Sequence, residues 1–283
     1  MKKSIVIGAN SFIGQCLIEN LKDTAVVTGI YHKNTDKLTA EGVQYIPYSE
    51  LTSITKDFDD VYLLSASIHT SPQLDARSRS DLFKSNVEQV AEICSHFSDS
   101  KIVYSSSVSV YNPSEELITE ASCPGAANEY GLSKYWGEKI IKKNSRYAIV
   151  RFPSVYGPGM KTNTIIPVYI NQALQKRQIT VWGDGARLQN YLHVTDAARY
   201  LMAAANLEEN DVFLAVSQNS VSNKALAGII AAYTSADIAF TGTDITPSIS
   251  YNNNYSRDRL GYTSSTSLEE GIKQMIKWIE KEL

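Results

Sequence analysis

The strongest constraint on the fold is a repeated alternation between short runs of β-branched residues and longer stretches with helical periodicity. An apolar run at 4–8 predicts a first strand, and the stretch 12–21 that follows places its apolar residues on one helical face. Further strands are predicted at 25–30, 43–46, 61–66, 101–106 and 147–152, with helices at 77–97 and 129–145. Alternation of this kind is typical of α/β proteins with a doubly wound parallel sheet.

The pattern changes after Gly159. Helices are predicted at 165–176, 195–206, 223–234 and 267–282, short apolar stretches at 179–182 and 212–216, and loops at 241–256 and 263–267. Ser267 and Glu270 have capping-box spacing at the start of the last helix. We therefore expect one folded unit with two regions: 1–160, whose sheet later segments complete, and a smaller α/β region, 161–283.

The composition excludes several classes of protein. With 27 basic and 30 acidic residues, the net charge of -3 and pI near 5.9 give no general attraction to nucleic acid or to anionic membranes. Three widely spaced cysteines argue for a reducing compartment, and no apolar run approaches the roughly eighteen residues of a membrane-spanning helix. We expect a cytoplasmic protein without a metal site, because no His/Cys/carboxylate cluster has metal-ligand spacing.

Two glycines bracket the junction between the first strand and the first helix. In Gly8-Ala-Asn-Ser-Phe-Ile-Gly14, the first glycine permits a tight turn, and the second lets the helix lie close to the sheet. The free N–H groups of the helix N-terminus would face a pyrophosphate. The alternative is an ordinary strand-to-helix turn.

Tyr130 and Lys134 are one helical turn apart, so the phenol and the ammonium share a face. A phenol with a pKa of about 10 must shift by roughly three units, about 4 kcal/mol, to exchange protons easily near neutral pH. An ammonium about 4 Å away supplies an interaction of that order at an effective dielectric of about 20. We therefore expect Lys134 to lower the pKa of Tyr130. The alternative is a surface tyrosine beside a solvated lysine.

Ser105, Ser106 and Ser107 end a predicted strand at the carboxyl edge, where open parallel sheets bind ligands. A hydroxyl there would hydrogen-bond a substrate oxygen beside the tyrosine. A nucleophilic role is disfavoured, because no G-x-S-x-G sequence surrounds these serines and no histidine is close in sequence.

In their order along the chain, these motifs resemble the extended short-chain dehydrogenase/reductases, the NAD(P)-dependent sugar-nucleotide epimerase/dehydratase family. The similar segments span nearly the whole chain: GANSFIG, DVYLLSA, Asn86, KIVYSSSVSVY, YGLSKYWGE, RFPSVYGPG, VWGDG and YLHVTDAA. The resemblance implies a Rossmann domain that binds NAD(P) and a C-terminal region that binds a nucleotide-linked sugar.

The resemblance also implies roles for individual residues. Tyr130 is similar to the family's proton-transferring tyrosine, Lys134 to the lysine that tunes it, and Ser107 to the hydroxyl that orients the reacting oxygen. The implied cofactor-binding residues are Gly8, Asn10, Ser11, Phe12, Ile13, Gly14, Ser65, Ala66, Asn86, Ser105, Tyr130, Lys134, Phe152, Pro153 and Val155. The implied substrate-binding residues are Ser67, Ser107, Thr164, Arg187 and Gln189.

Departures from the family pattern refine the cofactor. Ser11 replaces a middle glycine, and we expect binding to survive because the helix N-terminus remains. After the second strand, where NAD users of the family often have an acidic residue, this chain has Gly29 to Lys33. His32 and Lys33 would hold a 2′-phosphate, which favours NADP; the alternative is that both are solvated loop residues.

Other departures narrow the reaction. Val108 and Ser109 occupy the places of the acid pair of 4,6-dehydratases, so dehydration is disfavoured. Serine is also a poor base for a carbon-bound proton, which disfavours inversion at C3 or C5. For the substrate, the family has an arginine at the position of Gln189, and Arg187 would replace its charge. Arg257 and Arg259 are candidates for a second phosphate contact. His69 could touch the substrate, but a loop histidine without a role is the favoured interpretation.

The resulting expectation is a reductase that transfers hydride from NADPH to a keto group, favoured at C4, of a nucleotide-linked sugar, with Tyr130 as the proton donor. A 4-epimerase with bound NAD uses the same residues and stays an alternative, as does a non-catalytic NAD(P)-binding regulator. Relatives pair through two long helices, so segments 77–97 and 129–145 would form the helix bundle of a homodimer.

Overall fold

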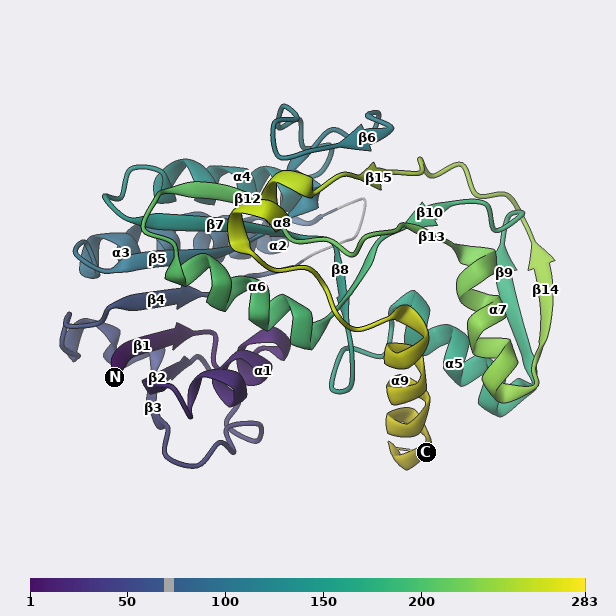
Figure 1. The fold of residues 1–283 in the computed structure, drawn as a ribbon, viewed down its shortest axis with the longest axis horizontal. Helices are drawn as coiled ribbons and strands as arrows, with labels where there is room; N and C mark the ends of the chain where they lie inside the picture. Colours follow the sequence, from purple (N-terminus) through teal and green to yellow (C-terminus); the bar gives the residue numbers. More distant parts are fainter. Residues whose placement is uncertain (69–73, 283) are drawn as a thin grey trace.

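The computed structural model describes residues 1–68 and 74–282. Its central sheet comprises β1 (Lys2–Ile7), β2 (Ala25–Tyr31), β3 (Gln44–Pro47), β4 (Asp60–Leu63), β5 (Lys101–Ser107), β7 (Tyr147–Phe152) and β12 (Asp211–Leu214). All neighbouring strands are parallel, in the order β12-β7-β5-β4-β1-β2-β3 (Figure 1). The predicted doubly wound α/β fold is therefore confirmed.

Strand β1 lies inside this sheet, between β2 and β4. Its last residue, Ile7, is level with Ile30 and Leu63 on the neighbouring strands, so three carboxyl ends meet at one edge. The N–H groups of Gly8 and Ala9 both donate to the carbonyl of Ile30, each at 2.9 Å. The chain therefore leaves the sheet edge at Gly8, the glycine predicted to begin a phosphate-binding turn.

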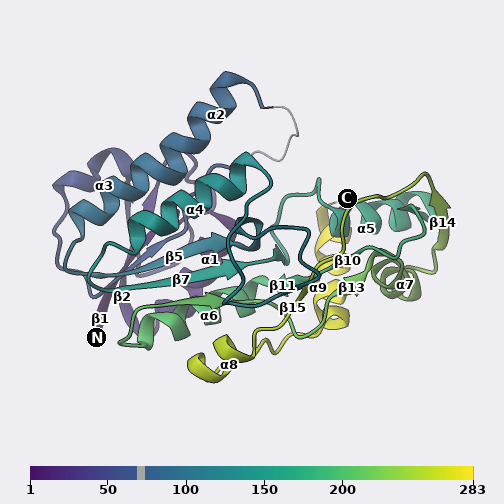
Figure 2. The same ribbon diagram turned by 90° about the horizontal axis from the view of Figure 1, so that it is seen from above.

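Helices cover both faces of the sheet, as Figure 2 shows from above. One face packs on α1 (Phe12–Leu21) and α6 (Val194–Asn206), and their apolar residues, such as Leu17 and Leu201, join Val6 and Val150 in one core. The other face packs on α3 (Gln89–His96) and α4 (Glu129–Ile141), where Ile93 and Ile141 belong to a second core. Coverage on both sides explains the nearly continuous hydrophobicity of these strands.

The segment predicted as one helix at 77–97 is divided. It consists of α2 (Ala76–Phe83), a π-helical turn (Lys84–Glu88) and α3. Turns of this kind insert an extra residue into a helix and occur often at functional sites. Here the turn contains Asn86, whose side chain is buried.

The C-terminal region lies at one end of the sheet (Figure 1). It comprises α5 (Ile165–Lys176), α7 (Asn223–Thr234) and α9 (Leu268–Glu282), beside β9 (Gln178–Trp182) paired with β14 (Asp237–Thr241). These elements share a separate apolar core that includes Ile170, Ile230 and Met275. The predicted cap of α9 is present, because the Glu270 N–H donates to Ser267 Oγ at 3.2 Å.

Short strands connect segments that are distant in sequence. The pairs are β8 (Ser154–Tyr156) with β11 (Tyr191–His193), β10 (Leu188–Gln189) with β13 (Val221–Ser222), and β6 (Leu117–Ile118) with β15 (Ser250–Tyr251). The prediction of a loop at 241–256 was wrong in part, because β15 and the start of α8 (Asn254–Leu260) lie there. Two-residue strands carry too little periodicity to be predicted.

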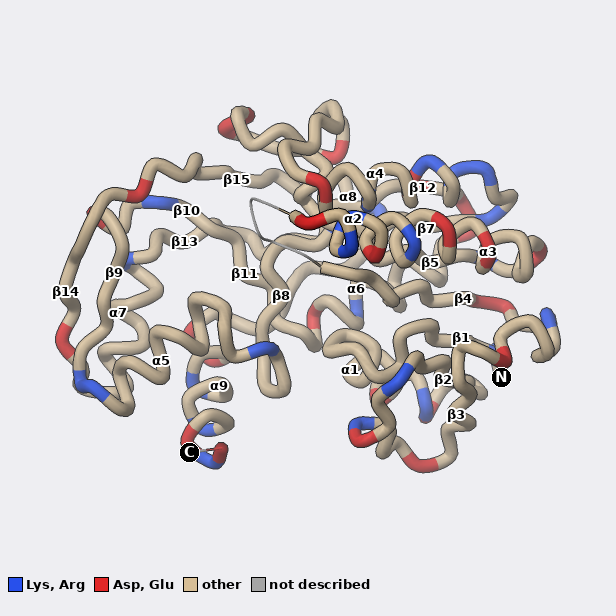
Figure 3. The backbone as a smooth tube through the Cα atoms, turned by 180° about the vertical axis from the view of Figure 1, so that it is seen from behind, with Lys and Arg blue, Asp and Glu red and all other residues tan. Residues whose placement is uncertain are grey.

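Charges of both signs are distributed over both regions (Figure 3). Within 1–68 and 74–282, no helix is long and apolar enough to cross a membrane. The same residues contain no group of three or more His, Cys, Asp or Glu side chains positioned to hold a metal ion.

Candidate active site

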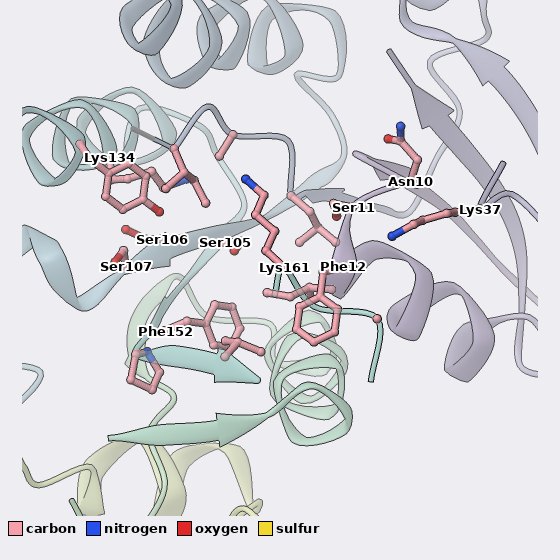
Figure 4. A pocket seen from close by; sticks show the side chains of 18 residues that line it. Asn10, Ser11, Phe12, Lys37, Ser105, Ser106, Ser107, Lys134, Phe152 and Lys161 are labelled. Carbon is pink, nitrogen blue, oxygen red and sulfur yellow. The ribbon is translucent and has the colours of Figure 1, made fainter. Parts of the chain in front are cut away.

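A cleft of about 470 Å³ opens at the carboxyl edge of the sheet (Figure 4). The turn before α1, the loop after β4, the end of β5, the start of α4, the end of β7 and the loop before α5 all contribute to its walls. Its lining includes the predicted residues Asn10, Ser11, Phe12, Ile13, Ala66, Ser105, Ser107, Tyr130, Lys134, Phe152, Pro153 and Val155. It also includes Ser106 of the predicted serine run, and Lys37, Leu64, Ile68, Gly159 and Lys161, for which the sequence predicted no role.

The glycine turn fits a cofactor's pyrophosphate. Gly8 has φ of +96°, and a Cβ there would lie 2.7 Å from the Ser65 nitrogen. A Cβ on Gly14 would lie 2.2 Å from the Gly8 carbonyl oxygen, so α1 approaches the turn only with glycine at this position. Both glycines therefore shape the cleft without lining it, and the N–H groups of Phe12 and Ile13 stay available for an anion.

Ser11 is accommodated as the N-cap of α1. Its φ of -75° is ordinary for a residue with a Cβ, and its Oγ accepts a hydrogen bond of 3.0 Å from the Gly14 N–H. The serine therefore satisfies one of the free donors at the helix start. A serine in place of the family's middle glycine therefore causes no backbone strain at this position.

Ser107, Tyr130 and Lys134 line the same cleft from two elements, the end of β5 and the first turns of α4. Asn128 begins α4 by accepting the Gly131 N–H at 2.8 Å, which fixes the helix start beside the serine strand. The Ser107 and Tyr130 side chains are hydrogen-bonded to each other. Ser107 Oγ also donates to Ser109 Oγ at 3.1 Å and accepts the Ser109 N–H at 3.1 Å.

The electrostatics of this pair differ from the expectation. Burial raises the pKa of Tyr130 to about 12, and its hydrogen bond with Ser107 offsets only part of that shift. Burial lowers the pKa of Lys134 to about 7, against an opposing influence of Glu138. The Lys134 Nζ lies 4.0 Å from the centre of the Tyr104 ring. Burial therefore makes the phenol less acidic in the protein alone, which contradicts the prediction that Lys134 lowers its pKa.

A buried ion pair joins α4 to β7, next to the cleft. Arg151 on β7 donates two hydrogen bonds to the Glu138 carboxylate, of 2.8 and 2.6 Å, and a third to the Tyr111 hydroxyl at 2.7 Å. Ser106 Oγ donates to the same carboxylate at 2.6 Å. Glu138 follows Lys134 by one turn, so this network fixes α4 against β5 and β7.

Asn86 does not line the cleft. Its amide accepts the Ser67 N–H at 2.9 Å, and its nitrogen donates to the Ser67 carbonyl and to Ser133 Oγ, at 3.0 and 2.9 Å. Ser133 Oγ donates in turn to the Tyr130 carbonyl at 2.8 Å. The asparagine therefore joins the loop after β4 to the start of α4, and both of its amide hydrogens are engaged.

His32 and Lys33 do not line the cleft. The His32 ring stacks on Tyr48, with ring centres 4.3 Å apart, and Lys33 is exposed. The basic residue of this loop that lines the cleft is Lys37. The loop between β2 and β3 contains no helix or strand, so its sequence has no periodicity that could show which residue lines the cleft. Ser65 also stays outside the lining, and its buried Oγ has no hydrogen-bond partner among the described residues.

The expected substrate residues are more dispersed. Arg187 lies between a cavity of about 450 Å³ beside Trp182 and one of about 150 Å³ that also includes Gln189 and Pro153. The Arg187 Nε is buried and has no hydrogen-bond partner in residues 1–68 and 74–282.

The other candidates lie outside these cavities. Thr164 is the exposed N-cap residue of α5, and Ser67 is held by Asn86. Arg257 pairs with Asp258, and Arg259 with Glu209 and Asp211. His69 falls outside the described residues.

The three comparisons agree on one group of proteins. The model of the NAD dependent epimerase/dehydratase family matches residues 4–214. The chain is 26% identical to a putative UDP-glucose 4-epimerase of Methanocaldococcus jannaschii, over 98% of each chain. It is 24% identical to a dTDP-4-dehydro-6-deoxy-D-allose reductase of a Streptomyces species, over 81% of this chain and 80% of the relative. The solved structure of UDP-glucuronic acid 4-epimerase from Bacillus cereus in complex with NAD superposes with a TM-score of 0.87, at 21% identity and 99% coverage of both chains.

Proposed function

Because the chain belongs to the NAD-dependent epimerase/dehydratase family, we propose that it is a 4-epimerase of a nucleotide-linked sugar that uses bound NAD. The observation that carries this proposal is the common cleft: Ser107, Tyr130 and Lys134 line it together with the glycine turn. A relative with the same printed activity is similar over 98% of this chain, which favours epimerisation over net reduction. A binding-only protein has no need for all three side chains in one cleft.

The residues of the cleft would act by moving one proton. The nicotinamide ring, held beside Phe152, Pro153 and Val155, supplies hydride acceptance and donation when it is bound. Ser107 would orient the C4 oxygen by a hydrogen bond, and the phenolate form of Tyr130 would accept the proton of the C4 hydroxyl and return it to the oxygen once the sugar presents its other face. A protonated Lys134 close to the phenol would favour the phenolate, which would oppose the effect of burial on Tyr130.

The cavities beyond the cleft suit a nucleotide. Pro153 lines both the cleft and the small cavity, and Arg187 lines both the small cavity and the one beside Trp182. An arginine with an unpartnered buried Nε fits a phosphate of the substrate, and the half-exposed Trp182 ring offers a stacking surface for a base. We assign cofactor binding mainly to residues 1–160 and nucleotide-sugar binding to 161–283.

Replacing Tyr130 by phenylalanine tests the proposal. Tyr130→Phe should lower kcat by about 10²–10⁴-fold, since it removes the acid–base group, and should change the Kd of NAD by less than about twofold. Tyr135→Phe on the same helix is the matched control, because Tyr135 does not line the cleft. Interconversion of UDP-sugars is followed by NMR. Undiminished turnover of Tyr130→Phe excludes the assigned proton transfer.

A keto-sugar reductase that uses NADPH is the second candidate. Two observations favour it: no acidic residue lies at Gly29 to Lys33, and Lys37 of the same loop lines the cleft. A reductase would consume NADPH only when a 4-keto sugar nucleotide is added, whereas an epimerase would retain NAD through purification and show no net consumption. In that case, Lys37→Ala should weaken the binding of NADPH more than the binding of NADH.

We also propose a homodimer. The exposed face of α2 and α4 carries Phe83, Leu132 and Trp136, which are 38%, 41% and 52% exposed. Leu132 and Trp136 are one helical turn apart, so they form one apolar stripe. Stripes of this kind are unusual on helices of monomers and fit a helix-bundle interface.

A further inference from the structure

The cleft has an uneven charge. Lys37, Lys134 and Lys161 line it, and no Asp or Glu is among its described lining residues. The chain as a whole is slightly acidic, with a net charge of -3. The positive lining is therefore a local feature, which fits a ligand with more than one negative charge.

The three lysines differ in their surroundings. Lys134 is 2% exposed and lies over the Tyr104 ring, beside the proposed proton donor Tyr130 on the same helix. Lys37 and Lys161 are exposed, and neither forms a salt bridge with any residue in 1–68 or 74–282. Their charges are therefore available to a bound molecule.

Lys161 comes from the C-terminal region. It follows Gly159, a residue with φ of +89° and open space at its Cβ position, and it precedes α5 by four residues. In Figure 4 its side chain lies in the middle of the cleft, between Ser105 at the strand end and Ser11 at the turn, while Lys37 lies farther along, beside Asn10. Lys161 therefore points into the same cleft that the N-terminus of α1 lines.

We propose that Lys161 binds the pyrophosphate of the dinucleotide together with the α1 turn, so that both regions of the chain hold the cofactor. The free N–H groups of Phe12 and Ile13 act from the start of α1, and the Lys161 ammonium acts from the loop before α5. An epimerase must keep its cofactor in both oxidation states, and a contact to the pyrophosphate is the same in both. The inference rests on the proposed function only in requiring that a dinucleotide occupy this cleft.

Binding measurements without any sugar reaction test this assignment. We expect Lys161→Ala to weaken the binding of NAD, NADH and ADP-ribose alike, with a Kd about tenfold higher when measured by calorimetry. The Kd of the variant should also depend less on salt concentration. ADP-ribose is the informative probe, because it retains the pyrophosphate and lacks the nicotinamide. Lys161→Arg should preserve most of the affinity. Lys277→Ala on α9 is the matched control, since it removes the same charge from an exposed site outside every cavity described above.

Two results would overturn the assignment. Unchanged affinity of Lys161→Ala for NAD and ADP-ribose would show that the ammonium does not reach the pyrophosphate. A loss confined to UDP, with dinucleotide affinity intact, would move Lys161 to the sugar nucleotide. If the wild-type chain binds no dinucleotide at all, the proposed function fails as well, which separates that outcome from the other two.

Discussion

At the scale of single residues, burial is the largest influence on the pKa values of Tyr130 and Lys134. Burial raises the pKa of Tyr130 and lowers the pKa of Lys134, because it disfavours the charged form of each group. The sequence correctly indicated that the two residues share a helix face and a cleft. Desolvation could not be predicted, because it depends on residues that are far apart in the chain, such as Tyr104 beside Lys134.

The shifted pKa of Lys134 predicts a pH-dependent stability. The ordinary pKa is 10.5 and the folded-state pKa is about 7, so between these values the unfolded chain binds more protons and stability rises with pH. Relative to Lys134→Met, the free energy of unfolding of the wild type should increase by about 2 kcal/mol from pH 7 to pH 9. Urea titrations at both pH values measure the difference. A constant difference between the two proteins would contradict the shift.

At the scale of elements, the features that could be predicted are those with a local physical cause. The alternation of strands and helices, the glycines at 8 and 14, and the cap of α9 were all evident in the sequence. The π-helical turn before α3 was not, because no local pattern marks it; its Asn86 bonds to Ser67 and Ser133, which lie on two other segments. Lys37 and Lys161 were missed for a similar reason, since both lie on loops without periodicity.

Two helix glycines should respond oppositely to alanine. Gly228 in α7 has no atom within 4 Å of a Cβ position, so Gly228→Ala should raise the free energy of unfolding by about 0.5–1 kcal/mol. In α9, a Cβ on Gly271 would lie 2.1 Å from the Tyr156 hydroxyl, so Gly271→Ala should lower it by about 1–3 kcal/mol. Chemical denaturation compares them. Equal effects would mean that α9 does not pack closely against Tyr156.

At the scale of the whole molecule, the proposed dimer depends on one exposed helix face. Trp136→Glu puts a charge in the stripe that Trp136 forms with Leu132, so light scattering should find a dimeric wild type and a monomeric variant. Ile245→Glu is the control, because Ile245 is 91% exposed in the other region. A monomeric wild type, or a Trp136→Glu variant that still pairs, would exclude this interface.

The edge strand β12 joins the sheet from a segment that follows α6, well after the other six strands. During synthesis, the cofactor-binding layer therefore stays one strand short, with the β7 edge uncovered, until residue 214 has left the ribosome. An uncovered edge strand is a site for unwanted pairing between chains. The nascent protein is thus most exposed to aggregation while its C-terminal half is being made, and severing the chain near residue 160 would leave the first fragment in that condition permanently.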